Sequence, residues 1–279
     1  MTTQLPIGVV IRTIGGDSAT WLDSARRIEE AGYTGVWAWD HLMGRPPGRP
    51  VVEAWTMLSM AAALTHRVTV GTFVANVMNR HPAVLARMAS TLQRASGGRL
   101  IVGLGVGAET GEHAAYGLAY PPIAERARRL EEAVAVMRAL WTGGPVTRES
   151  PTYPLHEAVA LPVPEPAPRI IVAGETPVGA RLAGRIGNGW TASDTNFETR
   201  LPDYLEALAH SGRRREEQLV LLEVNEGDWL DDSSLEQSPW VLEPRATWQR
   251  WRAAGADGAV ILARSPADVD ALVRAVERW

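Results

Sequence analysis

Residues 68–104, VTVGTFVANVMNRHPAVLARMASTLQRASGGRLIVGL, contain the pattern that decides the fold. The apolar runs at 68–73 and 100–104 are short and lack clean polar–apolar alternation, as is typical of strands buried on both faces of a parallel sheet. Residues 82–96 between them have helical apolar spacing, and Pro82 suits a first helical turn. The stretch therefore predicts two parallel strands joined by a helix.

The same unit recurs along the whole chain. Strands are expected at 7–11, 35–39, 68–73, 100–104, 169–173, 190–193, 219–224 and 258–262. Helices are expected near 18–31, 53–65, 82–96, 124–141, 177–187, 199–211, 245–254 and 266–277. Asp17 and Ser265 precede two of these helices as suitable N-caps. Eight strands alternating with eight helices favour the α/β class and a closed (β/α)8 TIM barrel, in one domain over residues 1–279.

Three stretches interrupt the alternation, at 44–50, 142–168 and 226–244. The first and third follow strands, so they are expected on the catalytic side of the barrel and would help to shape a site. The second, rich in proline, lies between a helix and the next strand. It is interpreted as a surface connection.

Composition narrows the function classes. The chain has 279 residues, 46% of them hydrophobic, and a formal charge of −4, so neither disorder nor nucleic-acid binding is expected. It contains neither cysteine nor lysine, which excludes thiolate chemistry and lysine imines. No histidine pair has metal-ligand spacing, so no metal site is expected. Without a membrane-length apolar run or a signal-peptide pattern, we expect a cytoplasmic protein with no membrane partner.

Polar residues follow two of the expected strands. Asp40 and His41 come directly after 35–39, and Asn76 follows 68–73. Side chains that leave the carboxyl ends of barrel strands point into a shared mouth, where a carboxylate can orient a proton-transferring imidazole. The alternative is that Asp40 caps a loop and His41 forms a structural hydrogen bond. For His81, before Pro82, we favour the capping role.

Residues 103–109, GLGVGAE, formally match the dinucleotide fingerprint G-x-G-x-x-A. That fingerprint needs a helix to begin at once, and the next expected helix begins near residue 124. The glycines, with Gly107 and Ala108 at the strand exit, instead favour a flat ligand lying against the backbone. Glu109 at the rim is either an acid/base group or a solvated loop carboxylate.

Residues 173–181, AGETPVGAR, place a glycine turn before a helix. A helix N-terminus attracts anions, and Arg181 about one turn into the helix would add a phosphate contact. The alternative is an ordinary turn between strand and helix. The tryptophans at 248, 251 and 279 are interpreted as packing residues rather than stacking platforms.

Taken in order, several stretches resemble the bacterial luciferase-like superfamily, in particular its coenzyme F420-dependent oxidoreductases. The similarity is carried by 29–41, 53–56, 65–72, 96–107, 112–117, 129–132 and 183–190. The ordered set, rather than any one stretch, is specific for the superfamily.

This resemblance implies a barrel that binds a deazaflavin or flavin across the carboxyl ends of its strands. Asp40 and His41 would lie near the reactive face, and Glu109 would lie near the acid of the family. The Phe73–Val74 step would be a non-prolyl cis peptide behind the ring. The other implied cofactor contacts are Asn76 at the ring and, at the phosphate, Gly174, Glu175, Thr176 and Arg181. Glu175 departs from the family, which often has glycine there.

The implied activity is hydride transfer between C5 of coenzyme F420 and a small organic substrate, with His41 or Glu109 as the acid/base group. An FMN-dependent monooxygenase that uses O2 and a separate flavin reductase is the alternative, and a non-catalytic cofactor-binding barrel is a third. The resemblance also implies a homodimer, which exposed tryptophans would fit, and a reductase that supplies reduced cofactor.

Overall fold

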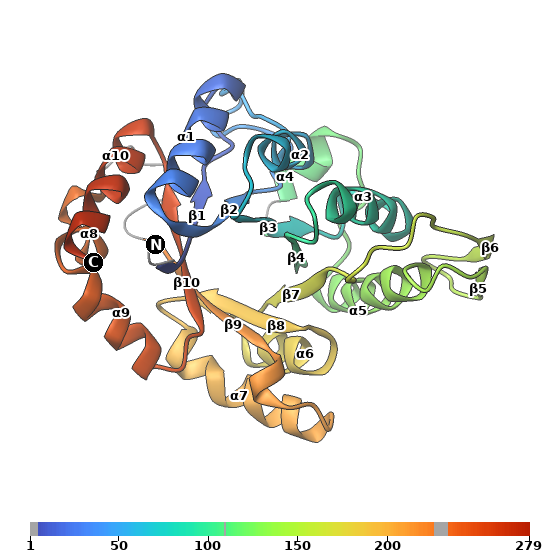
Figure 1. Ribbon diagram of the computed structural model, residues 1–279. Coiled ribbons are helices and arrows are strands. Elements are labelled where there is room, and N and C mark those ends of the chain that lie inside the picture. Colours follow the sequence, from blue (N-terminus) through green and yellow to red (C-terminus); the bar gives the residue numbers. More distant parts are fainter. Residues whose placement is uncertain (1–4, 109, 226–233) are drawn as a thin grey trace.

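The computed structural model describes residues 5–108, 110–225 and 234–279. Eight parallel strands close into a barrel in the order β1-β10-β9-β8-β7-β4-β3-β2 (Figure 1). The barrel strands are β1 (Leu5–Ile11), β2 (Tyr33–Ala38), β3 (Thr69–Asn76), β4 (Leu100–Gly105), β7 (Arg169–Ala173), β8 (Gly189–Ser193), β9 (Leu219–Val224) and β10 (Gly258–Ala263). The predicted TIM barrel is therefore confirmed.

Helices surround this barrel and connect its strands (Figure 1). They are α1 (Ser18–Ala31), α2 (Ala54–Leu64), α3 (Pro82–Ala95), α4 (Thr110–Ala115), α5 (Ile123–Leu140), α6 (Pro177–Ile186), α7 (Phe197–His210), α8 (Pro239–Leu242), α9 (Pro244–Ala253) and α10 (Pro266–Ala275). Short 3₁₀ turns lie at Arg215–Glu217, Leu235–Gln237 and Val276–Arg278. Within the described ranges, no helix is both long and apolar enough to cross a membrane.

The irregular stretch at 142–168 contains a small hairpin that the sequence pattern did not predict. Its strands β5 (Val146–Arg148) and β6 (Leu155–Ala158) pair antiparallel outside the barrel and extend to one side of it (Figure 1). Strands of three and four residues among prolines are too short for a periodic signal. Helices α4 and α8 were missed for the same reason. The hairpin lies between α5 and β7, as the expected surface connection does.

One indole fills much of the barrel interior. The side chain of Trp37 on β2 is buried and packs edge-on against Phe73 of β3, with ring centroids 5.4 Å apart. A Cβ added to Gly8, Gly35 or Gly71 would lie 2.3–2.5 Å from an atom of this indole. Strands β1, β2 and β3 therefore carry glycine where they face Trp37, because any larger residue would collide with it.

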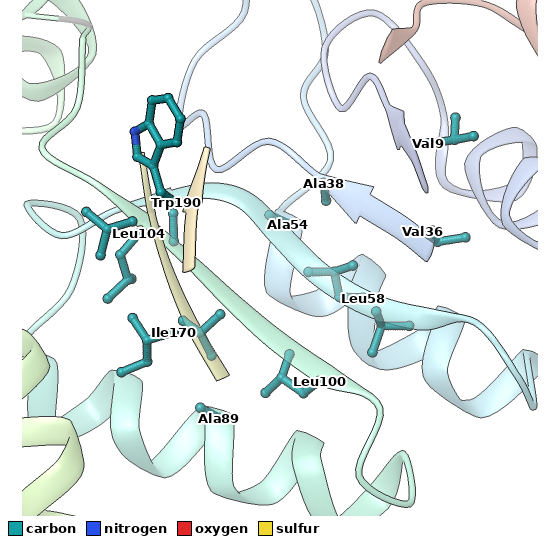
Figure 2. Packing of buried hydrophobic residues seen from close by; sticks show 14 of the residues in the cluster. Val9, Val36, Ala38, Ala54, Leu58, Ala89, Leu100, Leu104, Ile170 and Trp190 are labelled. Atoms are coloured by element: carbon teal, nitrogen blue, oxygen red, sulfur yellow. The ribbon is translucent and has the colours of Figure 1, made fainter. Parts of the chain in front are cut away.

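The main core lies between the strands and the surrounding helices (Figure 2). Trp190 of β8 is fully buried there and stacks on Phe197 and Tyr204 of α7. Trp240 of α8 is also fully buried, and its indole N–H donates to the Tyr33 hydroxyl at 3.0 Å. It anchors the chain after the 226–233 segment.

The tryptophans expected to be packing residues confirm that role. Trp251 and Trp279 pack against Trp240, with ring centroids 5.8 and 5.6 Å apart, and Trp248 lies half-buried against the core. None of the tryptophans that the structure describes is exposed. The described tryptophans therefore do not supply the exposed rings that were expected to fit a homodimer, because they are used in the fold of the chain itself; Trp229 lies outside the described residues.

Three predicted helix starts are also confirmed. Asp17 and Ser265 cap α1 and α10, where each side chain accepts a backbone N–H. His81 caps α3 through its ring nitrogen, which accepts from the N–H of Ala83 at 3.2 Å. Each cap satisfies a backbone donor that the first helical turn leaves without a partner.

We expect Gly8→Ala to lower the free energy of unfolding by about 1–3 kcal/mol, because the new methyl group overpacks the barrel against Trp37. Gly144→Ala is the matched control, since a Cβ there meets no atom within 4 Å and should change stability by less than about 0.5 kcal/mol. Urea unfolding followed by tryptophan fluorescence measures both. Equal effects of the two substitutions would contradict the packing argument.

Candidate functional site

The mouth of the barrel has a glycine-lined sector, where β3 bulges against β4. Their pairing shifts register between Thr72 and Ala75, and the Phe73–Val74 peptide is cis, as expected. A Cβ on Gly103 would lie 2.2 Å from the carbonyl oxygen of Thr72, and one on Gly105 would lie 2.8 Å from Val74 Cγ2. Only glycine fits beside the bulge, because the Thr72 carbonyl and the Val74 side chain occupy the space that a Cβ would take.

Next to this sector, Asp40 holds the turn that follows β3. Its buried carboxylate forms two hydrogen bonds with one guanidinium nitrogen of Arg80, at 2.9 and 2.7 Å, and accepts the backbone N–H of Asn76 at 3.2 Å. The amide of Asn79 donates to the same carboxylate and to the Asp40 carbonyl. Arg80 also pairs with Glu53, the N-cap of α2.

Burial raises the pKa of Asp40 above its ordinary value, and the Arg80 guanidinium and the Asn76 N–H act against that shift. A buried carboxylate is stable only when hydrogen-bond donors replace the water that it has lost. The residues that supply these donors are therefore held in place. Asp40 therefore positions the 76–80 turn, and with it the side chain of Asn76.

Asn76 is fixed at both ends of its amide. Its oxygen accepts the N–H of Met78 at 2.9 Å, and its nitrogen lies 3.2 Å from Nε2 of His113, a buried residue of α4. Burial lowers the pKa of His113, which favours a neutral ring that accepts this amide N–H. Gly107, at φ +76°, makes room, because a Cβ there would lie 2.4 Å from the Asn76 nitrogen.

His41 leaves β2 next to Asp40 and pairs with a carboxylate from a distant part of the chain. Its Nδ1 lies 2.6 Å from Glu112 Oε1, and the other oxygen of Glu112 accepts the N–H of Leu42 at 2.9 Å. Trp39 packs edge-on against the imidazole, with ring centroids 5.8 Å apart. The Glu112 carboxylate thus fixes the plane of the His41 ring and favours its Nδ1–H tautomer.

Glu112 is almost fully buried, and burial alone would raise its pKa. The hydrogen bonds from His41 and Leu42 outweigh burial and hold the pKa below its ordinary value. An ionised Glu112 can therefore stabilise a positive charge on His41 when that ring takes up a proton. The pair is a suitable acid/base unit at the mouth.

The predicted phosphate turn lies at the start of α6. Thr176 caps the helix by accepting the N–H of Gly179, and a Cβ on Gly174 would lie 2.5 Å from the backbone of Gly179. Arg181 projects from the second turn and forms an ion pair with Asp203 of α7. The N–H groups and dipole of this helix suit an anion, which would share Arg181 with Asp203.

Glu175 is directed away from this turn. Its carboxylate accepts the N–H and hydroxyl of Ser193 and the amide N–H of Asn196, at 2.8, 2.9 and 2.7 Å. These bonds tie it to the β8–α7 loop. The departure from the family pattern is therefore accommodated, since the three donors satisfy the carboxylate without help from a ligand.

A further carboxyl group, that of Glu223, lies at the end of β9. Leu219 and Leu221, four and two residues before it, face the barrel interior, so the alternation of the strand directs Glu223 to the same face. Burial, with the nearby charges of Glu175 and Asp194, raises its pKa to about 7, and Asn225 donates to it at 2.9 Å.

The structure brings Asp40, His41, Asn76 and Gly107 together at one side of the mouth and the 174–176 turn at another. Ala108 is exposed at the exit of β4, and Glu109 lies outside the described residues. The sequence analysis missed Glu112 and Glu223. Glu223 had a readable signal, as the one charged residue within the apolar strand LVLLEV; Glu112 stands in a stretch similar to the family but has no local signal for its contact with His41.

We expect Glu223→Gln to raise the free energy of unfolding at pH 8 by about 2–3 kcal/mol. In the folded chain Glu223 keeps its proton up to about pH 7, whereas in the unfolded chain it loses the proton near its ordinary pKa of 4.5. Between these two values the unfolded state binds fewer protons, so the free energy of unfolding falls as the pH rises. The gain should shrink toward pH 5. Urea unfolding at the two pH values checks this, with exposed Glu216→Gln as control; an equal gain at both would contradict it.

Comparison with known proteins agrees with this geometry. The family model described as luciferase-like monooxygenase matches residues 9–225. A Kineococcus radiotolerans protein named F420-dependent glucose-6-phosphate dehydrogenase is 37% identical over 203 residues, which cover 68% of this chain and 58% of that relative. The chain thus matches less than two thirds of that relative's length.

Two solved structures share the fold. An F420-dependent secondary alcohol dehydrogenase, in complex with an F420–acetone adduct, superposes with a TM-score of 0.84 at 22% identity and covers 100% of this chain and 98% of that one. A long-chain alkane monooxygenase superposes with a TM-score of 0.79 at 14% identity and covers 99% and 91%. These structures share the fold, and the family model, which spans β1 to β9, shows that the chain belongs to the luciferase-like monooxygenase family.

Proposed function

We propose that this chain is a coenzyme F420-dependent oxidoreductase that exchanges a hydride between the deazaflavin and a small organic substrate. The observation that carries the proposal is the pairing of a glycine-lined sector, at Gly103 and Gly105, with the His41–Glu112 acid/base unit at the same mouth. The names of the relatives support the choice of this cofactor within the family.

The residues present fit such a cofactor. The backbone of β4 beside the β3 bulge offers a flat contact for a tricyclic ring, with the Asn76 amide held at its edge. The α6 turn at Gly174, Thr176 and Arg181 would hold the phosphate of the cofactor. When bound, the deazaflavin supplies hydride exchange at C5.

His41 would move the proton that accompanies this hydride. Removing hydride from an alcohol also requires removal of its hydroxyl proton, and the reverse reaction requires a donor at the same oxygen. Glu112 keeps the His41 ring oriented and stabilises its protonated form. Glu109 was the other expected acid/base residue, and we keep it in this proposal as a group at the rim of the mouth.

The substrate is proposed to be a small organic molecule, and the names of the relatives favour a sugar phosphate. We also propose a homodimer in the cytoplasm, served by a reductase that supplies reduced cofactor where the reaction consumes it. Exposed Met60 and Leu64 on α2 and Val84 on α3 support a second copy packing there, since α2 and α3 are in contact. Size-exclusion chromatography with light scattering measures the assembly.

A parallel titration with coenzyme F420 and FMN tests the cofactor. We expect F420 to bind at micromolar concentration or tighter, detected by its fluorescence, because both the ring sector and the phosphate turn are preformed. Preferential binding of FMN would support the oxygen-dependent monooxygenase instead. Binding of neither would overturn the proposed function.

His41→Ala should lower turnover by about 10²–10⁴-fold while leaving F420 binding nearly unchanged, because the residue moves a proton rather than holding the cofactor. Glu112→Gln should cause a smaller loss. The assay follows the decrease in F420 absorbance with glucose 6-phosphate, and His156→Ala, on exposed β6, is the control. Wild-type turnover by the His41 variant would refute the assigned role.

A further inference from the structure

Helix α4 carries two adjacent side chains that serve different parts of the proposed site. Glu112 orients the imidazole of His41, with 2.6 Å between Oε1 and Nδ1, and its second oxygen accepts the N–H of Leu42 at 2.9 Å. The Nε2 atom of His113 lies 3.2 Å from the amide nitrogen of Asn76. One short helix therefore sets the position of both the proposed proton-transferring group and the proposed ring contact.

The position of α4 depends on contacts outside the helix. An isolated helix of six residues is not stable in water. At its end, the Tyr116 hydroxyl donates to the Leu42 carbonyl at 2.8 Å, and the N–H of Leu118 donates to the carbonyl of His113 at 2.8 Å. The first of these bonds ties α4 to the loop that follows β2, and the second closes the last turn of the helix.

Tyr120 and Arg126 connect α4 to the exit of β4. The ring of Tyr120 packs on the His113 imidazole, with centroids 4.5 Å apart and an angle of 39° between the planes. The guanidinium carbon of Arg126, near the start of α5, lies 3.9 Å from the centroid of the Tyr120 ring. Its Nη1 donates to the carbonyls of Val106 and Gly107, at 3.1 and 2.7 Å. Because a guanidinium is attracted to the face of an aromatic ring, the three groups form one stack between α4 and α5.

The charge of Arg126 also suits the state of His113 that the site requires. A neutral imidazole can accept the amide N–H of Asn76, whereas a protonated ring has only donors. Burial lowers the pKa of His113, and the charge of Arg126 adds to this effect, while the carboxylates of Glu112 and Asp40 act against it. Arg126 therefore favours the neutral ring in addition to holding it in place.

We propose that Arg126 is a positioning residue for the reaction, which acts through Tyr120 and α4 on the acid/base unit and on the ring contact. The inference rests on the proposed function for the reaction itself, whereas the orientation of His41 can be measured without it. Because Arg126 binds the carbonyls at the exit of β4, it also fixes α4 relative to the glycine-lined sector. The proton-transferring group and the ring contact are thus held by the same stack of side chains.

Nitrogen NMR of the full chain without cofactor tests the effect on the imidazole. At about pH 8.5, where an ordinary histidine is neutral, we expect His41 of the wild type to show the Nδ1–H tautomer, assigned by its loss in His41→Ala. In Arg126→Gln and in Tyr120→Ala we expect the Nε2–H tautomer to appear, because α4 no longer holds Glu112 against the ring.

Two conservative or distant variants separate a positioning role from general damage to the fold. Tyr120→Phe keeps the ring that packs between His113 and Arg126, so it should keep the tautomer and the turnover of the wild type. Arg128→Gln, on the exposed side of α5 and paired with Glu125, should do the same. Arg126→Lys, which keeps the charge, replaces Arg126→Gln if thermal unfolding shows that the latter is not folded, and it should show a partial change.

Kinetics with coenzyme F420 and glucose 6-phosphate measure the consequence for the reaction. Arg126→Gln should lower kcat about tenfold or more and change the KM of the sugar phosphate less than about threefold, because it disturbs proton transfer rather than substrate binding. F420 binding should weaken about 2- to 10-fold, the amount that one hydrogen bond at Asn76 supplies. In the Glu112→Gln background, Arg126→Gln should lower kcat by a further factor of only about two or less, since it acts through Glu112.

Each outcome decides between the proposals. If Arg126→Gln and Tyr120→Ala stay folded and keep the Nδ1–H tautomer, or if kcat is unchanged although the tautomer changes, the positioning role is refuted. An altered tautomer in Tyr120→Phe or Arg128→Gln would also refute it, because these substitutions leave the stack in place. If the wild type binds no F420, the proposed function fails, but a changed tautomer in Arg126→Gln would still support the control of His41 by Arg126.

Discussion

The indole of Trp37 can lie inside the barrel only because three adjacent strands carry glycine where they face it. With Phe73 packed against its edge, this ring lies in the interior below the mouth. Around Phe73, β3 bulges against β4, and β4 carries Gly103 and Gly105 where the bulge approaches it. Close packing thus accounts for the glycines around Trp37 in the barrel interior and for those beside the bulge at the mouth.

A buried charge organises the other side of that sector. The Asp40 carboxylate collects donors from the turn after β3, so the position of Asn76 follows from electrostatics rather than from the strand alone. His41, the next residue, is oriented by Glu112 from α4. The mouth therefore combines a glycine-lined sector on β4 with an oriented imidazole from the end of β2.

Much of the architecture was predictable. The apolar runs that became the eight barrel strands, the caps at Asp17 and Ser265, and the helix start at Pro82 all have local causes that can be read from neighbouring residues. The positions of Asp40, His41 and Asn76 followed from the rule that strand ends converge at one mouth. The β5–β6 hairpin and α8 were not predicted, because such short elements are stabilised by contacts such as those of Trp240 rather than by their own periodicity.

The sequence by itself therefore determined the order of the elements, the closed barrel, and the residue types at the strand ends. Only the tertiary structure decided which of these residues contact one another. His41 and Glu112 are 71 residues apart, Asp40 and Arg80 are 40 apart, and Arg12 and Arg264 line one cavity from opposite ends of the chain. Periodicity reports which face of an element is buried, but a hydrogen bond or ion pair between distant residues depends on closure of the barrel, which brings the first strand beside the last.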